Sequence, residues 1–244
     1  VYSSTRTGGN WYADETPIPG ATGATHVMLA ENEGKAITYR YSSHISNAIT
    51  MWIPSAVPGL LAWFDPSAET TLTLVSGKVS QFIPRAGSLA ASLIAAQGVD
   101  ANRPSWAANA RNGHPGLVFP NAITYLQLNS IAGLPGTTAT SVVVGAGFCD
   151  AIAANYRAFF SWGPTSGSSN RTMGKGPGNF VGHYGSTSGL DYVTTASWLG
   201  ADKIVVDTVT NTNGEEYVDG VLAGSKAWTY NTVAGGIGRI GCWS

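Results

Sequence analysis

Residues 215–223 read EEYVDGVLA, and this stretch predicts a β-hairpin. Residues 215–218 and 221–223 flank Asp219-Gly220, a dipeptide that favours the type I′ turn because both central residues need a positive φ. A second turn is expected at Ser76-Gly77, between strands at 72–74 and 78–82. Tight antiparallel hairpins are therefore the first element of the fold that the sequence predicts.

Further strands are expected along most of the chain. Residues 37–41 (ITYRY) alternate as a half-buried strand should, and the apolar runs at 141–148 and 203–209 predict core strands. A helix is conceivable at 88–96, and the Gly-, Ser- and Asn-rich residues 163–189 are expected to form a long exposed loop with short pairings. Many short strands about 10 residues apart are typical of an all-β sandwich or jelly roll.

The composition argues against some classes of function. Charged residues make up 11% of the 244 residues, against about 25% in an average soluble domain. The net charge of −1 argues against nucleic-acid binding, and the sequence holds no apolar run long enough to span a membrane as a helix. A surface with so few charges suits a subunit of a larger assembly or an extracellular protein.

Two prolines divide the chain. Pro54 and Pro58 bias their neighbours to extended geometry and mark a stiff linker. We expect a first module at 1–53, a linker at 54–58 and a larger domain at 59–244. Because the sequence begins with Val rather than Met, we expect a processed product or an incomplete sequence.

The two cysteines, Cys149 and Cys242, are too few for a disulfide framework. Two buried thiols are the favoured interpretation. A single bridge, or a contact between chains, remains open.

The sequence contains no complete motif for binding a nucleotide or zinc. Residues 236–241 (GIGRIG) match the spacing of a dinucleotide-binding loop, but the sequence stops three residues later, so no helix follows to bind a phosphate. Residues 142–147 match it incompletely. The four histidines (His26, His44, His114 and His183) lack the close spacing of zinc ligands.

Glycoside hydrolysis would need two carboxylates about 5–10 Å apart. Glu215 and Glu216 are adjacent, so on a strand they point to opposite faces, and Glu216 and Asp219 straddle a turn. Neither arrangement makes a convincing acid–base pair. A pair assembled from distant strands is left open, and we expect a protein that is not an enzyme.

Aromatic residues are the remaining candidates for binding, because sugars stack on aromatic rings. Four of them lie in or near turn-rich segments and are candidates for glycan stacking: Trp162, Tyr184, Trp198 and Trp228. The alternative is that each is a partly buried core residue.

Calcium binding has weaker support. A calcium ion needs several oxygen ligands, and three residues could help to supply them: Asp150, Asn179 and Asp191. No segment has a recognisable calcium-loop spacing, so no cofactor is expected and the metal ligands stay unknown.

Residues 59–243 resemble the concanavalin A-like (laminin-G-like) jelly rolls of bacteriophage virion proteins and bacterial surface proteins. The resemblance rests on segments that follow in the family's order: 58–67 (PGLLAWFDPS), 72–82 (LTLVSGKVSQF), 102–106 (NRPSW), 112–119 (NGHPGLVF), 217–221 (YVDGV) and 237–241 (IGRIG). It implies a sandwich fold and transfers no calcium or sugar ligand.

Residues 11–47 resemble the second half of a bacterial or phage immunoglobulin-like repeat. The segments 11–22 (WYADETPIPGAT) and 33–40 (EGKAITYR) carry this resemblance, which implies that Trp11 is a core residue. The front strands of that repeat and the last strand of the jelly roll have no counterpart. We expect either a fragment or a neighbouring subunit that supplies the missing pairing.

The resemblance implies a structural or decoration protein on the surface of a phage particle, at the head, neck or tail, with the jelly roll as contact module. The expected partners are other virion proteins or copies of this chain, and host polysaccharide as a further candidate. The alternatives are a host-surface glycan-binding adhesin and, less favoured, a glycan hydrolase.

Overall fold

The computed structural model describes residues 2–3, 8–26, 32, 35–50, 57–120, 123–134, 141–148, 157–163, 171–175, 180–184, 192–197, 200–210, 212–227 and 236–241. Within these residues the protein is all-β, with short 3-10 turns as the only helical elements. No helix in this part of the chain is long and apolar enough to cross a membrane. The chain divides into two compact units, Val1–Leu60 and Leu61–Ser244. The linker expected at 54–58 lies beside this division, and most of it lies outside the described residues.

The first unit contains a five-stranded antiparallel sheet in the order β3-β2-β5-β6, with β7 also paired to β5, and a separate pair, β1 and β4. The strands are β1 (Tyr2–Ser3), β2 (Asn10–Ala13), β3 (Thr16–Pro17), β4 (Thr25–His26), β5 (Ala36–Tyr41), β6 (His44–Ile45) and β7 (Ile49–Thr50). The strand expected at 37–41 is thus confirmed.

Trp11 and Tyr39 form the centre of this unit. Their rings lie 5.0 Å apart between centroids, and they are 3% and 5% exposed. Each ring also satisfies a backbone group: the Trp11 indole N–H donates to the carbonyl oxygen of Gly23 (2.9 Å), and the Gly9 N–H donates to the Tyr39 hydroxyl (2.8 Å). The expected core position of Trp11 is confirmed, whereas a relation to immunoglobulin-like repeats stays a prediction.

The second unit contains an eleven-stranded sheet in the order β12-β11-β9-β10-β13-β22-β15-β16-β17-β18, with β8 paired to β9. Its strands are β8 (Leu72–Val75), β9 (Lys78–Phe82), β10 (Ala95–Ala96), β11 (Ser105–Arg111), β12 (His114–Val118), β13 (Leu126–Leu128), β15 (Arg157–Gly163), β16 (Arg171–Lys175), β17 (Phe180–Tyr184), β18 (Tyr192–Ser197) and β22 (Ile237–Ile240). Two 3-10 turns, η3 (Glu69–Thr71) and η4 (Asp100–Asn102), connect strands.

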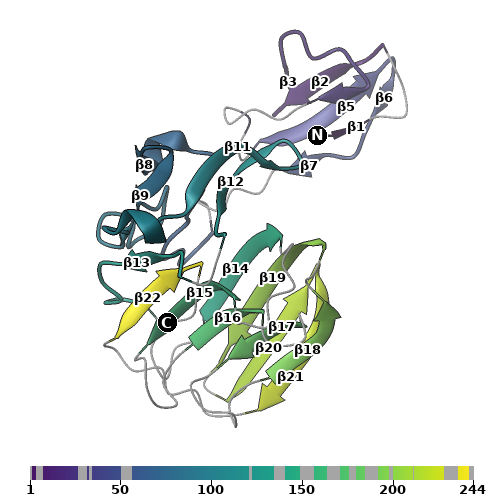
Figure 1. Cartoon of the computed structure of the whole chain (residues 1–244). Coiled ribbons are helices and arrows are strands. Elements are labelled where there is room, and N and C mark those ends of the chain that lie inside the picture. The colour runs from purple at the N-terminus through teal and green to yellow at the C-terminus, as the bar shows by residue number, and fades with distance from the viewer. Residues whose placement is uncertain are drawn as a thin grey trace. The chain divides into compact units, whose positions relative to one another are not determined.

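A second sheet of four strands covers part of the first. It has the order β14-β19-β20-β21 and consists of β14 (Ser141–Phe148), β19 (Asp202–Val209), β20 (Asn213–Val218) and β21 (Val221–Ala227). β14 contacts β15, β20 contacts β17, and β21 contacts β18, so these strands form two layers (Figure 1). The all-β class expected from the sequence is therefore confirmed, with several antiparallel sheets, whereas a concanavalin A-like jelly roll stays a prediction.

Both predicted tight turns are confirmed. Val218 pairs with Val221 across Asp219 and Gly220, whose φ values are 52° and 81°. Ser76 and Gly77 have φ values of 52° and 77°. Positive φ at both central residues is the requirement of a type I′ turn, and its twist matches that of the flanking strands.

Two local predictions need correction. Residues 88–92 form turns, and Ala95 and Ala96 form the short strand β10. The helix considered at 88–96 is therefore absent. The segment 163–189, expected to be a long exposed loop with short pairings, does contain such a pairing, between β16 and β17, but Thr172 and Met173 of β16 are buried rather than exposed. β10 is held by pairing with β9 and β13, and β16 by its place between β15 and β17 in the large sheet. Local composition does not reveal these contacts.

The main core of the second unit lies on one face of the large sheet. Its fully buried members include Leu93, Leu126 and Val79, which are at most 1% exposed. They come from β9, β13 and the segment before β10, and Phe64 and Ile240 pack against them. Because this cluster draws on residues far apart in the sequence, it stabilises the whole sheet rather than one hairpin.

Candidate functional site

Trp162 lies in the core. It sits on β15, is 3% exposed and packs with the main cluster, and its ring centroid is 5.3 Å from that of Phe160. A buried indole offers no face to a sugar ring, so the structure takes Trp162 out of the expected glycan-stacking set. The inward direction of this position on β15 explains the burial.

The other three aromatic candidates stay predictions. Trp198 and Trp228 lie outside the described residues, and Tyr184 ends β17 with a side chain that is also outside them. The same holds for Cys149 and Cys242, and for the calcium candidates Asp150, Asn179 and Asp191. Within the part of the chain that is described, no group of three or more His, Cys, Asp or Glu residues could hold a metal ion.

The strongest surface feature is the outer face of the four-stranded sheet. Its exposed apolar side chains, with their exposed fractions, are Val142 (59%), Val144 (63%), Ile204 (54%) and Leu222 (52%). Strand register joins them through half-buried residues: Val144 lies opposite Val206, Val206 opposite Tyr217, and Tyr217 opposite Leu222. We call these six residues the outer sheet face.

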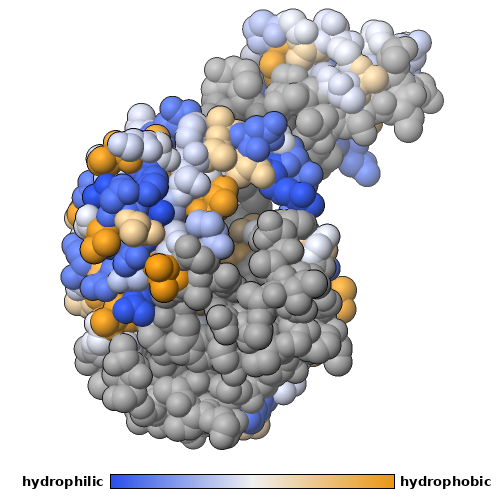
Figure 2. All heavy atoms as spheres, in the orientation of Figure 1, coloured by the Kyte–Doolittle hydropathy of each residue, from blue (hydrophilic) through white to orange (hydrophobic). Residues whose placement is uncertain are grey.

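Exposed apolar residues elsewhere in the second unit are scattered. Over the coloured surface of residues 57–134, hydrophobic and hydrophilic residues are interspersed (Figure 2). Leu74 and Val75 lie on β8, Val118 lies on β12, and Val99 and Ile123 lie between strands. Single exposed apolar residues are normal on a protein surface, whereas a contiguous group is a candidate contact site. The outer sheet face is such a group.

Directly beneath it, the inner face of the same sheet holds a pair of acids. Asp207 on β19 and Glu216 on β20 lie opposite each other across the strands, and both are 0% exposed. Opposite residues of an antiparallel pair have Cβ atoms about 5 Å apart. The neighbouring rows on this face are apolar: Val205 opposite Val218 on one side, and Val209 opposite Gly214 on the other.

Glu216 is not compensated by hydrogen bonds. Neither of its carboxyl oxygens has a hydrogen-bond partner, and the residue opposite it on β21 is Gly224, which has no side chain. Burial raises the pKa of Glu216 well above its ordinary value, and the charge of Asp207 raises that pKa further. The Glu216 carboxyl therefore stays protonated over a pH range in which an exposed glutamate is ionised.

This pair is the one that sequence reasoning missed. In the sequence the acids near Glu216 are Glu215 and Asp219, whereas in the fold the acid opposite it is Asp207 on the neighbouring strand β19. The signal was present in the sequence: in residues 205–209 (VVDTV), Asp207 alternates with Val205 and Val209 and so shares their inward face. The pair resembles an acid–base pair in spacing, but full burial leaves no path for a substrate to reach it.

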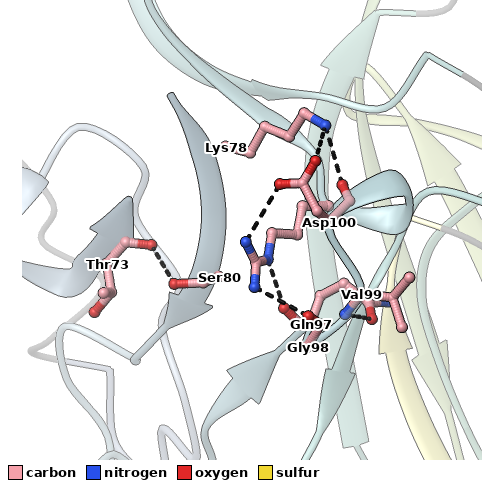
Figure 3. A network of polar contacts seen from close by, with 8 residues as sticks. Thr73, Lys78, Ser80, Gln97, Gly98, Val99 and Asp100 are labelled. Carbon is pink, nitrogen blue, oxygen red and sulfur yellow. Dashed lines mark hydrogen bonds and ion pairs between the residues drawn. The ribbon is translucent and has the colours of Figure 1, made fainter. Parts of the chain in front are cut away.

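A polar network lies at the surface of the large sheet (Figure 3). The Asp100 carboxylate accepts hydrogen bonds from Lys78 Nζ (2.6 Å) and Arg103 Nη1 (3.3 Å). Arg103 also donates through Nε to the carbonyl oxygen of Gln97 (2.8 Å) and through Nη2 to that of Gly98 (3.0 Å). The hydrogen bond from Lys78 is the main cause that lowers the pKa of Asp100.

This network has a structural role. Gln97 adds a bond of its own, because its side-chain oxygen accepts the N–H of Val99 (3.0 Å). Together these bonds hold η4 against β9. The Asp100 carboxylate and the Arg103 guanidinium are already bonded within the protein, so the network is not a ligand site.

Comparison of the sequence with protein-family models and with curated proteins finds no match. Among solved structures, a Trypanosoma rangeli sialidase in complex with 2,3-difluoro-KDN has a partly similar arrangement, with 16% sequence identity and a TM-score of 0.47. The match covers 83% of this chain and 29% of that one, so the chain spans under a third of the sialidase. Similarity at this level gives no argument about activity.

Proposed function

We propose that this protein is a structural or decoration protein on the surface of a bacteriophage particle, with the sandwich as its contact module. The observation that carries the proposal is the outer sheet face. Its members Val142, Val144, Ile204 and Leu222 are each more than half exposed. Apolar surface of this kind is stabilised when another protein covers it.

The composition supports the same proposal. With 11% charged residues, the chain has few of the solvated charges that keep an isolated protein surface in water. The phage setting comes from the resemblance of the sandwich segments to virion jelly rolls. The partners in this proposal are other virion proteins or further copies of the chain, and the location is the outside of the particle.

The proposal includes no catalytic step. A hydrolase would use two carboxylates that reach its substrate, whereas Asp207 and Glu216 are both fully buried. A glycan-binding adhesin would use exposed aromatic rings, and Trp162 is not one of them.

The test is the presence of the chain in purified particles at a fixed copy number, measured by quantitative mass spectrometry and antibody labelling in electron micrographs. We expect constant stoichiometry across preparations and labelling on the particle surface. Absence from the particle would overturn the proposal. Specific binding of the free chain on a glycan array would favour the adhesin instead.

A matched pair of variants tests the surface itself. Val144→Lys places a charge on the outer sheet face, whereas Val118→Lys places one on β12, at a residue that is 41% exposed. We expect the first to reduce incorporation into particles and the second to leave it unchanged. Equal incorporation of both variants would remove the outer sheet face as the contact surface.

A further inference from the structure

The sequence contains two Asn-Gly dipeptides, Asn112-Gly113 and Asn213-Gly214. Asparagine is one of the thermolabile residues of proteins, because the backbone nitrogen of the next residue can attack its side-chain carbonyl carbon. Glycine as the next residue favours this attack, since it has no Cβ to hinder the approach. Both dipeptides are therefore chemically able to deamidate, and their surroundings in the fold decide which of them reacts.

Asn112-Gly113 forms the tip of the hairpin between β11 and β12. The two residues have φ values of 51° and 81°, and both are exposed, as are Arg111 and His114, which pair on either side of them. Below the tip the pairing is interrupted by a register shift between Ala107 and Arg111. A local opening of the tip therefore breaks few contacts and costs little free energy.

Asn213-Gly214 has different surroundings, because it lies at the start of β20, between β19 and β21. Gly214 is buried and lies opposite Val209 on one side and Lys226 on the other. The Asn213 carbonyl oxygen accepts a hydrogen bond from the Thr210 N–H (2.8 Å). A turn of the backbone that brings the Gly214 nitrogen to the Asn213 side chain would break pairing on both sides, so this opening costs more than that of the hairpin tip.

The side chain of Asn112 attaches the hairpin tip to the four-stranded sheet. Its Nδ2 donates a hydrogen bond to Asp202 Oδ2 (2.8 Å), and Arg111 Nε donates one to Asp202 Oδ1 (2.9 Å). Asp202 is the first residue of β19. The Gly113 N–H donates to Asn109 Oδ1 (2.9 Å). Contacts between exposed groups such as these are individually weak, so they open readily and leave Asn112 able to react.

We propose that Asn112 deamidates spontaneously in the folded protein while Asn213 is protected, and that the product releases the hairpin tip from β19. A bond forms between the Gly113 nitrogen and Asn112 Cγ, and the bond from Cγ to Nδ2 breaks. The amide nitrogen leaves as ammonia with the proton of the Gly113 N–H. Water then opens the resulting succinimide at either carbonyl and leaves an aspartyl or isoaspartyl residue. The inference does not rest on the proposed function.

The product changes the contact with Asp202. Where the Asn112 amide donates a hydrogen bond to Asp202 Oδ2, the new carboxylate is an acceptor only and has no proton to donate at neutral pH. Two negative charges then lie side by side and repel each other. The formal net charge of the chain changes from −1 to one unit more negative. Deamidation therefore replaces an attraction at the hairpin tip by a repulsion.

Peptide mapping by mass spectrometry tests the choice of site. The full chain is incubated in mildly alkaline buffer, once folded and once unfolded in urea, and deamidation of Asn112 and Asn213 is followed in the same samples. We expect similar rates for the two residues in urea, and in the folded chain a rate for Asn213 at least about tenfold lower than that for Asn112. Equal rates in the folded chain would overturn the inference. So would an intact Asn112 after a time in which the unfolded chain has reacted fully.

Isoelectric focusing gives a second measurement with matched variants. The folded wild type and Asn213→Gln are both expected to accumulate one more acidic species, whereas Asn112→Gln is not, because a longer side chain does not form the five-membered ring. Formation of the acidic species by Asn112→Gln, or its absence from Asn213→Gln, would assign the reaction to another residue.

Hydrogen exchange at residues 109–114 tests the release of the tip. Asn112→Asp carries the charge of the product, and Asn112→Gly removes the amide without adding a charge and tolerates the positive φ. At low salt we expect the tip to exchange about two- to fivefold faster in Asn112→Asp than in Asn112→Gly, the effect of an exposed charge pair. High salt should close this gap by screening. Equal exchange in the two variants, or a gap that salt leaves unchanged, contradicts release by repulsion from Asp202.

Discussion

The two interior clusters of the second unit differ in chemistry. The main cluster around Leu126 and Trp162 is formed by apolar side chains. The smaller cluster around Met173, Val205 and Val218 lies beside Asp207 and Glu216, which are as completely buried as the valines. The Glu216 carboxyl, which has no hydrogen-bond partner, opposes folding, whereas a buried apolar group favours it. The four-stranded layer is therefore expected to be the less stable one.

The two faces of the four-stranded sheet differ in a similar way. The inner face buries Asp207 and Glu216 between rows of valine, whereas the outer face exposes Val142, Val144, Ile204 and Leu222. Both features depart from the usual placement of acids outside and large apolar residues inside. An inverted pattern of this kind costs stability in an isolated chain. It becomes less costly once a partner covers the outer face, so the pattern fits a protein that works in an assembly.

The largest loss of stability is expected from a substitution in the main apolar cluster. Trp162→Ala should lower the free energy of unfolding by about 3–5 kcal/mol, because it removes a buried indole and leaves a cavity. Urea denaturation followed by far-UV circular dichroism measures the change. The control is Val221→Ala at an exposed position, which should have little effect, and a similarly small loss for Trp162→Ala would contradict the burial of this ring.

A substitution beside the second, smaller cluster is expected to increase stability rather than reduce it. Glu216→Leu should raise the free energy of unfolding at neutral pH by about 1–3 kcal/mol, because it replaces an unpaired buried carboxyl by an apolar group of similar size. The matched control is Glu215→Leu, whose carboxylate on the other face of β20 accepts a hydrogen bond from the Tyr217 hydroxyl (2.7 Å). If both variants change stability alike, the difference between the faces is not real.

The pH dependence sharpens the same comparison. The folded pKa of Glu216 is raised above the ordinary value of 4.5, so its protonated form contributes stability that is fully present below pH 4.5. That contribution is lost as the pH rises through the folded pKa. We expect Glu216→Gln to retain more of its stability than the wild type over this range. Parallel melting-temperature profiles of the two proteins would count against a buried titrating Glu216.

The smallest effect concerns the exposed network. The pKa of Asp100 is lowered below 3.8, so its contribution is present above that value and is lost as the pH falls through the folded pKa. Asp100→Asn should reduce the melting temperature slightly at neutral pH, and the difference should disappear in strong acid. A constant difference down to the lowest pH would assign the effect to packing rather than to charge.

The sequence predicted the local parts of this fold well. The turn at Asp219-Gly220 depends on two adjacent residues, and its type follows from their backbone preferences. The alternation of residues 37–41 likewise predicted the strand, in which Ile37 and Tyr39 are buried while Tyr41 at its end is exposed. These features are set by neighbours in the chain, so no distant contact is needed to infer them.

Features that depend on distant contacts were missed. Trp162 looked like a loop-side aromatic because the segment after it is rich in glycine and serine, yet β22 and β16 pair with its strand and bury it. The acid pair required the register between β19 and β20. Once the bond from the Thr210 N–H to the Asn213 carbonyl oxygen (2.8 Å) is known, that register follows.

β22 has a consequence for how the chain is made. This strand lies between β13 and β15, with Ile240 opposite both Leu126 and Phe160. A nascent chain that has left the ribosome only as far as β21 holds the two parts of the large sheet without the strand that joins them. The edges of β13 and β15 then stay unpaired until residues 237–240 are available. Synthesis therefore has to run past Ile240 before the sheet can close, and until then both strand edges are open to pairing with other chains.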